Sequence, residues 1–246
     1  MAALAIAAMT LFYVGGMYLN DAFDREIDRR ERPSRPIPSG TVSTGTVFAA
    51  GFGMLVVGLA LMAVAGLGSA AAGVALAAAV VAYDVSHKGN PVSPVMMGLC
   101  RMLVYVGTAS MVAGTVTGPV VGAGAAVLAH TAGLTYAAKQ ESLDRIDRLW
   151  PLAVLAVPLV VTACALLSGL APASSWAALA LADVLAVDLL RRRVAPGAVP
   201  RAVGALIAAL SLIDAALVAP IAPVVAGVCW AGYGLTRLLQ RFIPGT

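Results

Sequence analysis

Carboxylate and amide side chains recur at helical spacing in the stretch NDAFDREID near the start of the chain. Asn20, Asp24 and Asp28 are spaced i, i+4, i+8, so a continuing helix places them in one row on one face, with Asp21 beside that row. Like charges at this spacing repel each other, and the negative end of the helix macrodipole adds to the repulsion. A hard divalent cation would offset it, and Mg²⁺ is typically bound by one or two carboxylates together with substrate phosphates. The stretch therefore predicts a magnesium and diphosphate site.

A second acidic cluster lies in the stretch KQESLDRIDRLW. Its carboxylates recur at every third position, at Glu141, Asp144 and Asp147, and its basic residues include Lys139 and Arg145. Two acidic clusters at one membrane face could hold two metal ions with a diphosphate between them, and basic side chains would bind the remaining phosphate oxygens. Both clusters would also suit ordinary solvated loops beside a membrane, where positive residues are common. The strict row in the first cluster favours the metal site there.

The elements that must position these residues are membrane helices. The chain has 246 residues, of which 61% are hydrophobic and 11% are charged, and its mean hydropathy is +0.93. A soluble domain carries about 25% charged and about 45–50% apolar residues. The composition therefore excludes a water-soluble globule and indicates close-packed helices rich in Ala and Gly.

Apolar runs long enough for transmembrane helices, which need about 20 residues, recur along the whole chain. We identify nine of them, at residues 2–20, 44–65, 69–86, 93–114, 119–138, 151–170, 173–190, 200–219 and 221–239. Charged loops alternate with uncharged loops, as expected when all charged loops lie on the cytoplasmic side. The pattern predicts one polytopic membrane domain over residues 1–246, with the N-terminus outside and the C-terminus inside. The acidic loops 20–43 and 139–150 would both be cytoplasmic.

Polar residues inside the apolar runs are candidates for interior roles, because charges at membrane depth are expensive. Arg101 would line a pocket or form an internal ion pair. Asp183 has no partner nearby in the sequence, so it would pair with Arg101 or stay protonated. His130 would be a hydrogen-bonded interior residue or would orient an acceptor substrate.

The residues of the first cluster resemble the UbiA superfamily of intramembrane prenyltransferases. The pattern NDxxDxxxD at 20–28, followed by RPIPSG at 35–40, is similar to that family's first aspartate-rich motif and its downstream element. The stretch YDVSHK at 83–88 resembles a later tyrosine-to-lysine element, and ESLDRID falls where the family has its second aspartate motif. Within the superfamily, the variant RERPSRPIPSG most resembles the EboC-type branch.

The resemblance implies an all-α bundle of about nine transmembrane helices around a central cavity that is open to lipid. It also implies an integral protein of the bacterial inner membrane, with its active site at the cytoplasmic face. Two features depart from the family pattern. The second motif reads ExxDxxD, which leaves open which of its carboxylates bind metal. The first motif lies on the first apolar run, not on the second, so the first family helix is expected to be absent, through a truncated or misassigned start.

The activity that the resemblance implies is Mg²⁺-dependent transfer of a prenyl group from a prenyl diphosphate to a small aromatic or hydroxyl acceptor. Metal ions and cationic side chains would draw charge onto the leaving diphosphate, and an apolar cavity would keep water from the allylic cation. The expected partners are the diphosphate donor, an acceptor of unknown identity and membrane lipid, and no nucleic acid.

The resemblance also implies site residues. The expected metal ligands are Asn20, Asp21, Asp24, Asp28, Glu141, Asp144 and Asp147. The expected catalytic residues are Tyr83, Lys88 and Arg101. The expected diphosphate contacts are Arg35, Lys88, Lys139 and Arg145. Asp84 lies outside the family pattern, and would support Lys88 or act as a general base.

Other functions fit some of the same residues. A membrane transporter would place its polar residues near the bilayer midplane on broken helices, whereas the acidic clusters here lie at one face. A catalytically degenerate prenyltransferase homologue would explain the irregular second motif. A CDP-alcohol phosphotransferase also has paired aspartate motifs, but its compact block of DG, AR and GxxxDxxxD is absent from the sequence.

Overall fold

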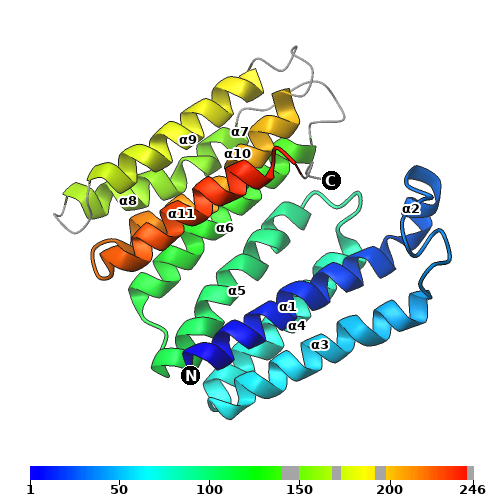
Figure 1. Ribbon diagram of the computed structural model, residues 1–246. Coiled ribbons are helices and arrows are strands. Elements are labelled where there is room, and N and C mark those ends of the chain that lie inside the picture. Colours follow the sequence, from blue (N-terminus) through cyan, green and yellow to red (C-terminus); the bar gives the residue numbers. More distant parts are fainter. Residues whose placement is uncertain (140–149, 168–172, 192–197, 243–246) are drawn as a thin grey trace. The chain divides into compact units, whose positions relative to one another are not determined.

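The computed structural model shows an all-helical chain (Figure 1), which confirms the expected fold class. It describes residues 1–139, 150–167, 173–191 and 198–242. Within these residues there are eleven helices and no strand. The chain divides into two compact units, Met1–Gly124 and Ala125–Thr246. The single membrane domain over residues 1–246 stays a prediction.

The helices follow the predicted apolar runs closely. The first unit contains α1 Ala2–Phe23, α2 Arg25–Glu31, α3 Thr44–Val64, α4 Leu67–Ser86, α5 Ser93–Ala113 and the start of α6 Gly118–Lys139. The second unit contains the rest of α6, α7 Trp150–Leu155, α8 Val157–Leu167, α9 Ala173–Arg191, α10 Ala198–Val218 and α11 Pro223–Leu239.

One predicted run is broken in the structure. The run 151–170 is split into α7 and α8 at Ala156. Pro158 explains the break, because proline has no N–H to donate to the carbonyl four residues earlier and its ring crowds that turn. The nine predicted spans are therefore an approximate count.

Several helices have the length and composition of membrane spans. Among the described helices, α1, α3, α4, α5, α6 and α10 are long and apolar enough to cross a membrane. Together with the overall hydropathy, they identify an integral membrane protein. The central cavity open to lipid stays a prediction.

The helix that carries the start of the first acidic cluster, α1, packs closely against α3. A Cβ atom added at Gly51 would lie 2.8 Å from Leu19 Cγ, and one added at Gly58 would lie 3.1 Å from Phe12 Cε2. Small residues at such positions let two helix backbones pack tightly, which is how membrane helices associate. Phe12 and Leu19 are fully buried in the core of this unit.

The packing of α1 against α4 brings a second helix to the same end of α1. A Cβ atom added at Gly16 would lie 3.1 Å from Val80 Cγ1. One helical turn further along each helix, Asn20 of α1 forms a hydrogen bond with Asp84 of α4. The Gly16–Val80 contact therefore sets the register that places Asp84 beside the acidic motif.

The second unit has its own core around α9 and α10. Leu134, Ala186, Leu190 and Leu206 are buried together there. His130 is fully buried, and its Nε2 atom lies 2.9 Å from the backbone oxygen of Leu206. This contact matches the interior, hydrogen-bonded role expected for His130.

Candidate active site

The first acidic cluster lies where α1 passes into α2. Asp24 is the junction residue, and its N–H donates to the Asn20 carbonyl at 2.9 Å, while the Asp28 N–H donates to the Asp24 carbonyl at 2.9 Å. The helical hydrogen-bond pattern thus continues across the junction. The backbone therefore retains the spacing on which the predicted row of Asn20, Asp24 and Asp28 depends.

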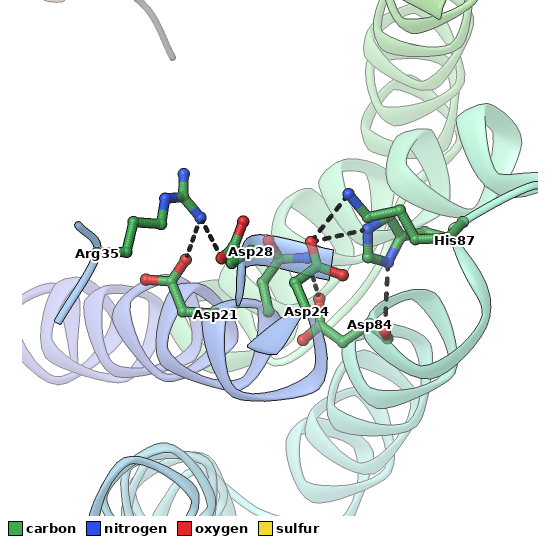
Figure 2. A network of polar contacts seen from close by, with 8 residues as sticks. Asp21, Asp24, Asp28, Arg35, Asp84 and His87 are labelled. Atoms are coloured by element: carbon green, nitrogen blue, oxygen red, sulfur yellow. Dashed lines mark hydrogen bonds and ion pairs between the residues drawn. The ribbon is translucent and has the colours of Figure 1, made fainter. Parts of the chain in front are cut away.

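Two of the carboxylates are buried. Only 7% of Asp24 and 6% of Asp28 is exposed, whereas Asp21 is exposed. A buried carboxylate is strongly unfavourable unless it is paired with a cation or hydrogen-bonded. Asp28 lies beside Arg35, and Asp24 lies beside His87 (Figure 2) and Lys88.

Arg35 links Asp28 to Asp21. Its Nη1 atom lies 2.7 Å from Asp28 Oδ2 and 3.1 Å from Asp21 Oδ1. The hydrogen bond to Asp28 raises the pKa of Arg35 further above its ordinary value. Because Arg35 begins the RPIPSG stretch, this pairing folds the loop after α2 back onto the end of α1. A guanidinium predicted to contact diphosphate is thus held between two carboxylates of the motif.

A cavity of about 340 Å³ adjoins this pair. Its charged lining residues are Asp21, Asp28 and Arg35, and its apolar lining includes Ile37, Val42 and Val47. The cavity therefore combines a charged end with an apolar wall within the first unit.

Asp24 is paired with residues that follow α4. Lys88 Nζ lies 3.1 Å and His87 Nε2 lies 3.4 Å from Asp24 Oδ2. The Nδ1 atom of His87 lies 3.2 Å from the Asp84 carbonyl, and its ring stacks on Tyr83 with centroids 5.0 Å apart. The YDVSHK stretch is thereby brought onto the NDxxD stretch, as Figure 2 shows for Asp24, Asp84 and His87.

Asp84 and Asn20 complete this side of the cluster. Asn20 Nδ2 donates a hydrogen bond of 3.2 Å to Asp84 Oδ1. Only 5% of Asp84 is exposed, and its second oxygen, Oδ2, has no hydrogen-bond partner among the described residues. An ionised carboxylate can only accept, so the amide nitrogen of Asn20 faces Asp84 and its carbonyl oxygen stays available to another partner.

The cluster includes residues that were not among the expected metal ligands, catalytic residues or diphosphate contacts. His87 was outside the predicted set, and Asp84 was expected to support Lys88 or to act as a general base. Asp84 directly follows Tyr83, and His87 directly precedes Lys88. Their place in the sequence alone therefore puts them near those two residues. Their contacts with α1 depend on the packing of two helices, which the spacing does not reveal.

The remaining predicted site residues are not part of these contacts. Arg101 is exposed on α5 and forms no hydrogen bond or ion pair with another described residue. Lys139 is exposed at the end of α6, in the second unit. Glu141, Asp144, Arg145 and Asp147 lie outside the described residues.

The oxygen atoms of the cluster suit magnesium in their chemistry. Carboxylate and amide oxygens are the hard ligands that Mg²⁺ prefers, and Asp84 Oδ2 is a buried oxygen to which no described residue donates a hydrogen bond. In the part of the chain that the structure describes, no group of three or more His, Cys, Asp or Glu side chains is arranged to hold a metal ion by itself. Water molecules, and substrate phosphates when the donor is bound, would therefore supply the rest of the coordination.

Comparison with known protein families shows which family the chain belongs to. The sequence matches the UbiA prenyltransferase family over residues 1–242. The chain belongs to the UbiA prenyltransferase family. The match confirms the resemblance seen in the motifs, and it identifies the protein as a prenyltransferase. The EboC-type branch stays a prediction.

A solved structure shows the same fold as this UbiA-family chain. It is described as "Structural and mechanistic insights into the biosynthesis of Digeranylgeranylglyceryl phosphate synthase in membranes", and its TM-score is 0.67. The two sequences are 19% identical, and the match covers 88% of this chain and 84% of the other. A search of curated proteins found no match.

Proposed function

We propose that this UbiA-family prenyltransferase takes its prenyl group from a prenyl diphosphate in a Mg²⁺-dependent reaction at the cytoplasmic face of a bacterial inner membrane. The acceptor is a small molecule with an aromatic ring or a hydroxyl group. The observation that supports this proposal is the meeting of two sequence elements, NDxxD and YDVSHK, through the contacts of Lys88 and His87 with buried Asp24.

The first cluster contains the residues proposed to hold one magnesium ion. They are Asn20, Asp24 and Asp28, with Asp21 beside them. Glu141, Asp144 and Asp147 are proposed to hold a second ion. Bound magnesium would supply positive charge to the diphosphate oxygens, and so would make the diphosphate a better leaving group.

The cationic side chains would bind the diphosphate itself. Lys88 is suited to this role, because half of its side chain is exposed (50%) while its Nζ atom is already held beside Asp24. When a cation binds Asp24, the lysine ammonium would turn to a phosphate oxygen and form a charge-assisted hydrogen bond. Arg35, Lys139 and Arg145 are proposed as further diphosphate contacts.

Tyr83 and Arg101 are the other proposed catalytic residues. Tyr83 is held against His87 by ring stacking, so its orientation is linked to the group that contacts Asp24. Its electron-rich ring would stabilise an allylic cation that forms as the carbon–oxygen bond to the diphosphate breaks. Arg101 would stabilise negative charge on the departing diphosphate.

The reaction is tested with membranes that contain the protein and labelled geranylgeranyl or farnesyl diphosphate. We expect donor consumption with Mg²⁺, loss of consumption with EDTA, and loss of consumption in the Asp24→Ala variant. Glu26→Gln is the matched control, because Glu26 is an exposed carboxylate at the same end of α1 and pairs only with neighbouring arginines in the described structure. Donor consumption that persists with EDTA or with Asp24→Ala would contradict the proposal.

The acceptor is sought by mass spectrometry of lipids from cells with and without the protein. The solved relative is named as a digeranylgeranylglyceryl phosphate synthase, so a glyceryl phosphate bearing one geranylgeranyl group is one acceptor to supply. Aromatic acceptors form the second arm of the same assay. A prenylated product in one arm identifies the acceptor class.

A further inference from the structure

Asp84 is a buried carboxylate on α4 that the aspartate-rich motifs do not include. It is 5% exposed, and it lies beside the first motif because Gly16 and Val80 bring α1 and α4 into close contact one turn earlier. Figure 2 shows its carboxyl group next to Asp24. Two carboxylates close together in a buried position repel each other, so the arrangement favours a cation between or beside them.

The two oxygens of Asp84 have different environments. Oδ1 accepts a 3.2 Å hydrogen bond from the Asn20 amide, whereas Oδ2 is buried and has no hydrogen-bond partner in the part of the chain that the structure describes. A buried oxygen without a hydrogen-bond partner lowers the stability of the fold, because burial removes its hydrogen bonds to water and no donor replaces them. The side-chain nitrogen atoms of Lys88 and His87 nearby are directed to Asp24 Oδ2.

The hydrogen bond to Oδ1 also sets the orientation of Asn20. Because a carboxylate offers only acceptors, it selects the amide orientation in which Nδ2 faces α4 and the carbonyl oxygen faces away. The carbonyl oxygen is the only atom of that side chain that binds a hard cation. The role of Asn20 as a metal ligand therefore depends on a residue of another helix.

We propose that Asp84 is a positioning residue of the first magnesium site, where it orients Asn20 as a ligand and adds negative charge beside Asp24. This role rests on the proposed Mg²⁺-dependent function. It differs from a purely structural link between α1 and α4, because it requires that Asp84 change the affinity for the cation.

The test measures Mn²⁺ binding by electron paramagnetic resonance on the purified full chain in detergent, without diphosphate. The second cluster is first neutralised by Glu141→Gln, Asp144→Asn and Asp147→Asn, so that the signal reports the first cluster. In that background Asp84→Asn is expected to weaken Mn²⁺ binding about 10- to 100-fold, the effect usual for residues that orient metal ligands. An amide at this position removes the charge and accepts either orientation of Asn20.

Two controls separate positioning from folding. Glu26→Gln removes an exposed carboxylate from the first turn of α2, next to the first motif, and is expected to leave Mn²⁺ affinity unchanged. Circular dichroism and gel filtration check that each variant is folded. If Asp84→Asn does not fold, Asp84→Ser is used, because its hydroxyl is uncharged and both donates and accepts, so that it does not select one orientation of Asn20, and the same loss is expected.

A double variant tests whether Asp84 acts through Asn20. Asn20→Ala and Asp84→Asn together are expected to weaken Mn²⁺ binding by less than the product of their separate effects. Equal Mn²⁺ affinity in the background protein and in Asp84→Asn would overturn the role of Asp84, and fully multiplicative effects would overturn its action through Asn20. Absence of Mn²⁺ binding in the background protein would instead remove the first magnesium site, and the role of Asp84 with it.

Discussion

At the scale of single residues, each buried carboxylate of the first motif has its own partners. Asp28 is paired with Arg35, and Asp24 is paired with Lys88 and His87. The repulsion expected for a row of carboxylates is thus offset partly by the chain's own cations. A magnesium ion and a diphosphate would enter a cluster in which positive groups already offset part of the negative charge.

Removing Arg35 would leave Asp28 buried without its cation. We expect Arg35→Ala to lower the free energy of unfolding by about 1–3 kcal/mol, less than the loss for a fully buried pair because Arg35 is 29% exposed. Thermal unfolding in detergent measures the change. Arg29→Ala is the control: Arg29 pairs with Glu26 on the surface of α2, and its loss is expected to cost under about 1 kcal/mol. Equal stability of the two variants would show that the ion pair between Arg35 and Asp28 does not stabilise the fold.

Lys88 is expected to act on the donor diphosphate. Lys88→Ala should lower kcat/KM for the donor about 10- to 100-fold, the value of one charge-assisted hydrogen bond. Lys88→Arg should keep part of the activity, because the positive charge is retained. The measurement is a donor titration at saturating acceptor, and an unchanged kcat/KM in Lys88→Ala would show that the lysine has only a structural role beside Asp24.

At the scale of helices, small residues decide where the cluster forms. Gly51 lets α3 approach Leu19 on α1, and Gly16 lets α1 approach Val80 on α4. Larger side chains at these positions would push the helices apart, because membrane helices associate mainly through close packing. The polar site at the end of α1 therefore depends on apolar contacts one or two turns away.

Gly51→Ala tests this dependence. The added Cβ would lie 2.8 Å from Leu19 Cγ and 3.2 Å from the Gly15 carbonyl oxygen, so we expect a loss of about 1–3 kcal/mol in unfolding free energy. Gly53→Ala, in the same helix, has open space around its Cβ and is expected to be neutral or stabilising by up to about 1 kcal/mol. Thermal unfolding of both variants in detergent gives the comparison. Similar melting temperatures would show that α3 can shift away from α1 without cost.

At the scale of the whole molecule, the proposed cytoplasmic location of the site is a statement about topology. It is tested by replacing the native cysteines with alanine and introducing Ser39→Cys or Gly68→Cys, both at exposed positions. The proposal predicts that a membrane-impermeant maleimide labels Ser39→Cys in inside-out vesicles and labels Gly68→Cys in right-side-out vesicles. The reverse pattern would place the first motif on the outer face.

The sequence by itself determined the helices and the spacing of their polar groups. A long apolar run in a membrane must satisfy its backbone hydrogen bonds internally, so helices such as α1 and α3 follow from composition. Helical periodicity then places Asn20, Asp24 and Asp28 together without any tertiary information. The motif also resembled the UbiA family, which the family match confirms.

Only the tertiary structure decided which groups pair across elements. The bonds of Asn20 to Asp84 and of Arg35 to Asp28 depend on how α4 and the RPIPSG stretch pack against α1. Arg35 was predicted to contact a diphosphate, and its position between two carboxylates could not be read from its place in a loop. Pairing of this kind is set by side chains from distant parts of the chain, and the pattern within a single helix carries no information about it.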